Sequence, residues 1–188
     1  VLSELYELVK DKASFLVISV HGFGPVKKRF YLNKWLINEG YLKIKKSILS
    51  RKVSVDWSKT KVFAPINLWG GDLYFVKENC GSDYEKIREE IISKLLAFKE
   101  PAKDENIVGK VLRREEIYSG KYLTNAPDLL VVLRNPDYKI SGDLMSDELL
   151  KQVSMEEPAR EFTGDHRREG ILIDFNGIVK KQSQQLDV

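Results

Sequence analysis

Three short hydrophobic runs stand out along the chain, at residues 15–20, 129–133 and 171–175. Each is too short for a buried helix, and such runs are typical of strands covered on both faces in a parallel sheet. We therefore predict an α/β fold in which these three segments share one mostly parallel sheet. Because α/β proteins bind ligands at the carboxyl ends of such strands, the loop after residue 20 is a candidate site.

Apolar residues at helical spacing predict helices over residues 3–12, 26–39 and 83–98, with Gly40 placed to end the second. Further extended segments are predicted at 61–64, 72–76 and 107–118. The stretch from 135 to 163 has little periodicity, which indicates a long excursion on the ligand side of the sheet. We predict one domain over residues 1–188, with an inserted α+β lobe at about 26–125.

Composition places the chain among ordinary globular proteins. Its 188 residues are enough for one domain with a sizeable core, and its 43% hydrophobic content suits a water-soluble fold. No run approaches the roughly 20 apolar residues of a membrane-spanning helix, and the first residues lack the order of a signal peptide. We expect a cytoplasmic protein without a membrane partner. The single cysteine, Cys80, excludes an intrachain disulfide.

The most basic part of the chain lies between residues 27 and 52, where lysines and arginines alternate with Tyr31, Trp35 and Tyr41. Such a mixture suits a nucleic-acid surface. An amphipathic helix with its aromatic side chains in the core explains the same pattern and is the favoured interpretation. The net charge of +3 is too small to argue for nucleic acid by itself.

The chain has two histidines, His21 and His166, and each adjoins a predicted strand. Imidazole is a common zinc ligand, and loops at strand ends hold ligands rigidly. The two residues are 145 positions apart, so only the fold decides whether they meet. Arg167 and Arg168 follow the second histidine and either contact phosphate or stay exposed or paired with Glu169.

Five groups of residues, in this order and spacing, resemble one family over nearly the whole chain. They are Ile18-Ser19-Val20-His21-Gly22-Phe23-Gly24-Pro25, Asn33-Lys34-Trp35-Leu36 with Gly40-Tyr41-Leu42, Val55-Asp56-Trp57-Ser58-Lys59-Thr60-Lys61, Glu116-Ile117-Tyr118-Ser119-Gly120 with Ala126-Pro127-Asp128-Leu129, and Thr163-Gly164-Asp165-His166-Arg167. The sequence resembles the carboxyl-terminal half of the type I phosphodiesterase and nucleotide pyrophosphatase family, within the alkaline phosphatase superfamily. This resemblance implies part of a three-layer alkaline-phosphatase-like fold.

The resemblance also implies a chemistry. In that family two divalent metals, usually zinc, bind a phosphoester or nucleotide substrate, favour a threonine alkoxide and stabilise charge on the attacking and leaving oxygens. His21 would be a ligand of one metal and His166 a ligand of the other. Arg167 and Arg168 are the substrate-binding candidates.

The chain also departs from the family's pattern. Val20 stands where the family has an aspartate ligand immediately before the first histidine, and valine cannot coordinate a metal. The family's threonine nucleophile, its first aspartate and its Asp-x-x-x-His pair precede the position of His21, and residues 1–20 contain no such pattern. No catalytic residue is assigned, the isolated chain is expected to be inactive, and its own metal binding is expected to be absent or weak.

Three hypotheses follow. In the first, the chain is a fragment or truncated relative of a metal-dependent phosphoester hydrolase. In the second, it is a metal-free, non-enzymatic binding or assembly module that forms homo-oligomers, because half a sheet exposes an edge and an apolar face. In the third, which the small net charge does not favour, residues 27–52 bind nucleic acid.

Overall fold

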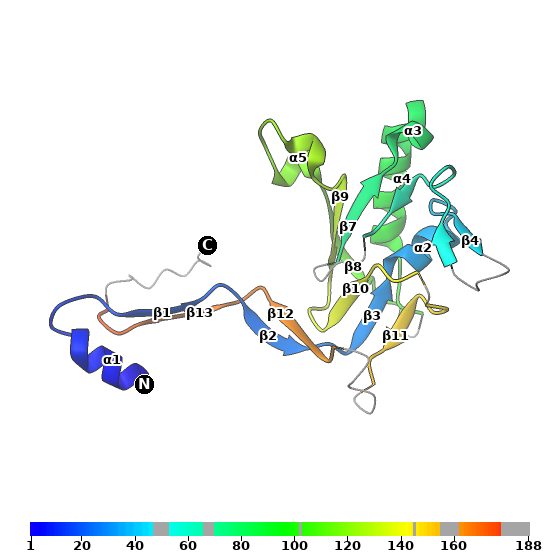
Figure 1. Ribbon diagram of the computed structural model, residues 1–188. Coiled ribbons are helices and arrows are strands. Elements are labelled where there is room, and N and C mark those ends of the chain that lie inside the picture. The colour runs from blue at the N-terminus through cyan, green and yellow to red at the C-terminus, as the bar shows by residue number, and fades with distance from the viewer. Residues whose placement is uncertain (47–52, 66–69, 102, 145, 155–161, 178–188) are drawn as a thin grey trace. The chain divides into compact units, whose positions relative to one another are not determined.

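The computed structural model describes residues 1–46, 53–65, 70–101, 103–144, 146–154 and 162–177 (Figure 1). The chain divides into two compact units. Unit 1 combines Val1–Pro25 with Gly164–Val188, and unit 2 is Val26–Thr163. The predicted inserted lobe at about 26–125 falls within unit 2.

Unit 1 is an antiparallel ribbon with a helix at one end (Figure 1). Its elements are α1 (Leu2–Val9), β1 (Leu16–Ser19), β2 (Gly22–Pro25), β12 (Gly164–Arg167) and β13 (Ile171–Asp174). β1 pairs with β13, and β2 pairs with β12, both antiparallel. The first and last described segments of the chain are therefore held side by side.

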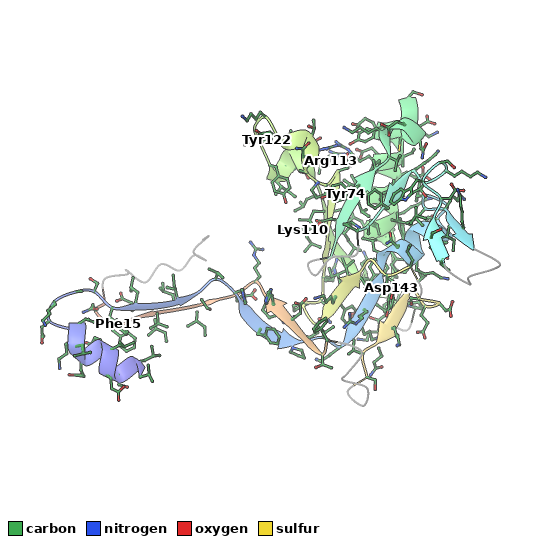
Figure 2. The ribbon with its side chains drawn as sticks, in the orientation of Figure 1. Phe15, Tyr74, Lys110, Arg113, Tyr122 and Asp143 are labelled. Atoms are coloured by element: carbon green, nitrogen blue, oxygen red, sulfur yellow. The ribbon has the colours of Figure 1, made fainter. Side chains whose placement is uncertain are left out.

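Three aromatic rings join α1 to this ribbon. The ring of Tyr6 lies 5.9 Å from that of Phe15 and 5.0 Å from that of Phe175, measured between centroids. Phe15 and Phe175 come from the two strand ends and lie 5.3 Å apart, and Figure 2 shows Phe15 beside the helix. The predicted helix over residues 3–12 is confirmed as a shorter element, Leu2–Val9.

Residues 15–20 include a strand, as predicted, but the prediction that this strand is central, parallel and covered on both faces is wrong. β1 is antiparallel to β13, and Ile18 is 66% exposed. Ile171 on β13 is 59% exposed. An uncharged run indicates that both faces of a strand are apolar, but it does not identify what lies against them.

In the residues that the structure describes, unit 2 contains three sheets and the remaining helices. Its elements are β3 (Lys28–Tyr31), α2 (Leu32–Asn38), β4 (Ile44–Lys46), β5 (Val53–Val55), β6 (Val62–Phe63), β7 (Asp72–Phe75), α3 (Lys77–Cys80), η1 (Gly81–Asp83), α4 (Tyr84–Ala97), β8 (Val108–Arg113), α5 (Arg114–Ile117), η2 (Leu123–Asn125), β9 (Leu129–Leu133), β10 (Tyr138–Ser141) and β11 (Leu150–Gln152). The sheets have the strand orders β6-β7-β9-β8, β10-β3-β11 and β4-β5. The protein is therefore a mixed α/β structure with several small sheets.

Several predictions for unit 2 are confirmed. The periodicity over 83–98 corresponds to α4, and the runs at 61–64, 72–76 and 129–133 correspond to β6, β7 and β9. Gly40 follows the C-terminal end of α2, as predicted, and its φ of +84° is a conformation that favours glycine. The segment 107–118 is extended only as far as Arg113, and α5 follows.

Two predictions about topology are wrong. The strand at 129–133 does not share a sheet with those at 15–20 and 171–175, because β9 lies between β7 and β8 in unit 2. Nor are the sheets mostly parallel, since β10 and β3 form the one parallel pair among the strands that the structure describes.

The predicted helix over 26–39 begins only at Leu32, because Lys28–Tyr31 pairs with β10 and β11 instead.

The core of unit 2 forms where α4 packs against the four-stranded sheet. Ile91 and Leu95 of α4 are fully buried, together with Leu73 of β7 and Leu129 of β9. The helix places these side chains four residues apart on one face, and the strands alternate inward and outward positions. No helix in the described part of the chain is long and apolar enough to cross a membrane.

One buried ionic network ties the elements of unit 2 together. Asp128, which is 3% exposed, accepts a hydrogen bond from the main-chain N–H of Phe75 at 2.8 Å. It also accepts one from the Tyr84 hydroxyl at 2.6 Å and forms an ion pair with Arg114. Arg114 donates further to two main-chain carbonyl oxygens. A single carboxylate thus connects β9, β7, α4 and α5.

We predict that Asp128→Ala destabilises the protein by about 3–5 kcal/mol, because it leaves the buried Arg114 guanidinium without its counter-charge. The measurement is urea unfolding followed by circular dichroism. Asp104→Asn is the matched control, because Asp104 pairs with Lys99 at the surface and asparagine tolerates its φ of +55°. An Asp128→Ala variant as stable as this control would contradict the network's role.

A second buried group connects β3, β10 and the end of the helical region. Glu100 is 3% exposed and forms an ion pair with Lys28. It also accepts a hydrogen bond from the Tyr138 hydroxyl at 2.7 Å. The hydrogen bonds from Lys28 and Tyr138 lower the pKa of Glu100. Burial of Tyr138, with its hydrogen bond to the Glu100 carboxylate, raises the pKa of Tyr138 to about 12.

Because the pKa of Tyr138 is raised in the folded state, its contribution to stability is complete below the unfolded tyrosine pKa of about 10 and is lost as pH rises toward 12. We expect the free energy of unfolding to fall more steeply over this range in the wild type than in Tyr138→Phe. Glu100→Gln should move the phenol titration, followed by ultraviolet absorbance, toward pH 10. Glu105→Gln, which removes only a more weakly acting charge, should shift it less.

Candidate functional site

The two histidines of the chain meet in unit 1. His21 lies between β1 and β2, and His166 lies on β12. Their ring centroids are 3.9 Å apart, with an angle of 34° between the ring planes. The fold therefore brings together two side chains that are 145 positions apart in the sequence.

The register of the β2–β12 pair explains this contact. His166 lies opposite Phe23, and Arg167 lies opposite Gly22. Since successive side chains of a strand point to opposite faces, His166 and Phe23 share one face while Asp165 belongs to the other. The Phe23 ring contacts the His166 ring edge-on, with centroids 6.2 Å apart. Asp165 is therefore not placed beside His166 as a second ligand.

Glycines on β2 permit the close approach of the second strand. A Cβ atom at Gly24 would lie 2.4 Å from the Nε atom of Arg167, and one at Gly22 would lie 2.4 Å from the main-chain oxygen of Glu169. The main-chain contact leaves no room for a side chain at Gly22, whereas a side chain at Gly24 would require the Arg167 side chain to move. The open space lets the Arg167 guanidinium cross the ribbon and donate to the Pro25 carbonyl oxygen.

The hydrogen bonding of His21 leaves one ring nitrogen available. Its Nδ1 atom lies 2.9 Å from the Gly22 carbonyl oxygen. A proton on Nδ1 makes this a hydrogen bond and leaves the lone pair on Nε2, which is the arrangement found in many metal-ligating histidines. Both histidines are exposed at the surface of unit 1. The donor chemistry therefore fits a divalent metal such as zinc.

The number of donors is smaller than a complete site needs. Among the residues that the structure describes, no group of three or more His, Cys, Asp or Glu side chains is placed to hold a metal ion. Val20, beside His21, is 75% exposed and carries no donor atom. Catalytic zinc sites use about three protein ligands and structural sites four. The histidine pair therefore fits as part of a metal site, and the described residues do not supply the rest.

The two arginines predicted to bind substrate have different surroundings. Arg167 is engaged by the Pro25 carbonyl oxygen, which gives it a role in holding the ribbon. Arg168 lies just beyond β12 and is exposed. Contact of either residue with phosphate stays a prediction.

The aromatic residues of the basic region are in the core. Tyr31, Trp35 and Tyr41 are all buried, with exposed fractions of 3–7%. They are not available for stacking on bases, so the interpretation as core aromatics is confirmed. Residues 47–52 of this region lie outside the described residues.

Two features were missed by sequence reasoning. Phe23 packs on His166, and only the strand register reveals this. Unit 2 also has a hollow of about 390 Å³, lined by Lys77, Gly81, Tyr84, Arg114, Glu115, Leu123 and Thr124. Its Arg114 is already bound to Asp128 and to main-chain carbonyl oxygens. No motif in the sequence marks this hollow.

No family model, curated protein or solved structure matches the chain. The family resemblance therefore depends on the sequence motifs alone. The histidine pair and its surroundings are the structural features that bear on the function.

Proposed function

We propose that the chain is part of a metal-dependent phosphoester hydrolase similar to the type I phosphodiesterases and nucleotide pyrophosphatases, and that His21 and His166 are imidazole ligands of its metal centre. The observation that carries this proposal is the 3.9 Å separation of the two rings. Two exposed histidines from distant segments are better placed to bind a metal centre than to pack in a core.

The spacing is compatible with two metals. In two-metal hydrolases the ions lie about 3.5–4 Å apart, so their ligands can come from side chains that contact each other, as these two rings do. Neighbouring imidazoles can therefore serve neighbouring ions. The contact between His21 Nδ1 and the Gly22 carbonyl oxygen supports the same assignment, because such bonds orient the ring of a metal ligand.

The residues of this chain have limited tasks in the proposed reaction. When bound, the metal ions supply charge that favours an alkoxide nucleophile and neutralises the phosphoester oxygens. His21 and His166 would hold the ions, and Phe23 would restrict the His166 ring. Arg168, which is exposed, is the better candidate for contact with substrate phosphate than Arg167, which is bound to Pro25. No residue of the chain is assigned as the nucleophile.

The exposed apolar strands of unit 1 support an alkaline-phosphatase-like three-layer fold as the complete architecture. Ile18 and Ile171 lie in water here, although their strands have the composition of buried ones. A larger sheet with helices on both faces would cover them. In this proposal, β1 and β13 are two strands of that larger sheet.

We predict that the chain binds Zn²⁺ weakly and that His21→Ala or His166→Ala weakens the binding further, since each variant removes one of the two imidazole ligands. Isothermal titration calorimetry measures the effect. Phe23→Ala is the control, because it removes a ring beside His166 without removing a donor atom. Zinc binding of unchanged affinity and stoichiometry after loss of either histidine would refute the proposed ligand roles.

We also predict that Val20→Asp tightens zinc binding, because it adds a carboxylate next to His21 at an exposed position. Ile18→Asp adds the same charge at another exposed position of the segment and serves as the matched control. The same titration compares the two variants. Equal affinity in both would mean that only the added negative charge attracts the ion, and the proposed site would lose its support.

A further inference from the structure

We propose that two copies of this chain associate through the free edge of β1, which pairs antiparallel with β1 of the second copy about a two-fold axis. The product is a four-stranded sheet with the order β13-β1-β1-β13. This inference concerns unit 1 alone and does not depend on the proposed hydrolase function.

As far as the structure describes the chain, the β1–β13 ribbon has two open edges and an uncovered apolar face. In the described part of the chain, β1 pairs only with β13, so the sheet has two strands. Two-stranded antiparallel ribbons are marginal in water without further strands or a packed helix, and α1 packs on the face that carries Phe15 and Phe175. The exposed fractions of Ile18, at 66%, and Leu16, at 47%, show that apolar area remains to be covered.

The β1 edge lacks the features that prevent edge-to-edge pairing. Soluble proteins protect exposed edges with charged residues, prolines or bulges. From Phe15 to Val20 there is no charged residue, no proline and no glycine, and the pairing with β13 is regular over all four residues of β1. Among the residues that the structure describes, no strand pairs with the N–H and C=O groups of this edge, so they can form a ladder with another strand.

The composition of the two edges selects β1 and a second copy of the chain. In antiparallel pairing about a two-fold axis, residues of the same face oppose each other, so Ile18 meets Ile18 or Leu16 of the other copy. No like charges approach at this edge. Pairing through β13 would instead bring Asp174, the charged residue of β13, into the new ladder. The edge of β1 therefore carries no charge, whereas the edge of β13 includes one carboxylate, so β1 is the edge that we select.

The helix leaves the relevant surface open. Tyr6 of α1 contacts Phe15 and Phe175, which share one face of the ribbon with Val17 and Ile173 by strand alternation. Leu16 and Ile18 belong to the opposite face. Contacts between these side chains of two copies cover part of that face without displacing α1.

The test is the molar mass in solution, measured by size-exclusion chromatography with light scattering. We expect the wild type to have twice the 21.7 kDa of one chain. Ile18→Lys should halve this mass, because the lysines of the two copies then lie close together on one face beside the axis and repel each other. Ile171→Lys, at a similarly exposed position on β13, is the matched control and should leave the mass unchanged. Circular dichroism verifies that each variant is folded.

A charge exchange makes the test specific. Ile18→Lys and Ile18→Glu should each be monomeric alone, and an equimolar mixture should recover the mass of two chains because opposite charges then meet. A wild type with the mass of one chain, or of more than two, overturns the proposal. So does equal dissociation by Ile171→Lys, or a mixture that stays monomeric.

These outcomes are separate from those of the proposed function. The substitutions at position 18 leave both histidines in place, and zinc titration of the same samples reports on the histidine pair. A monomeric chain that binds zinc through His21 and His166 overturns the association and supports the metal site. A chain that associates without binding zinc does the reverse.

Discussion

The antiparallel pairing of the first and last described segments is the constraint on which unit 1 depends. The registers of β1 with β13 and of β2 with β12 run from Leu16–Asp174 to Pro25–Gly164. A slip of one residue would turn each side chain to the opposite face and separate His166 from His21. The glycines of β2, the crossing Arg167 side chain and the histidine contact all follow from this register.

Unit 2 is stabilised differently. Its core has fully buried side chains from α4 and the four-stranded sheet, and buried charges are paired within it. Asp128 and Glu100 each connect segments that are distant in sequence. The described residues of unit 1 form a small aromatic cluster and a two-stranded ribbon. We infer that unit 2 supplies most of the stability of the chain and that unit 1 depends more on what it binds.

Local pattern identified the elements whose neighbours are close in sequence or whose period is long. α4 was predictable because its apolar residues repeat over four turns, and β7 and β9 because short apolar runs are bounded by glycine or proline. β3 was not, because Lys28–Tyr31 becomes a strand only through pairing with β10 and β11, more than 100 residues away. The histidine pair was recognisable as two candidates, but its geometry depends on the non-local register of β12.

The exposed β1 edge can serve either the association of two copies or the pairing with a further strand of a larger hydrolase sheet. Pairing with a second copy and pairing with another strand of a larger hydrolase sheet would use the same N–H and C=O groups of Leu16–Ser19. Each strand edge can form one ladder, so one partner excludes the other. The histidines lie beyond this edge, at the β2–β12 pair, and are not consumed by either pairing. A chain associated through β1 therefore keeps its imidazoles but loses this route into a complete sheet.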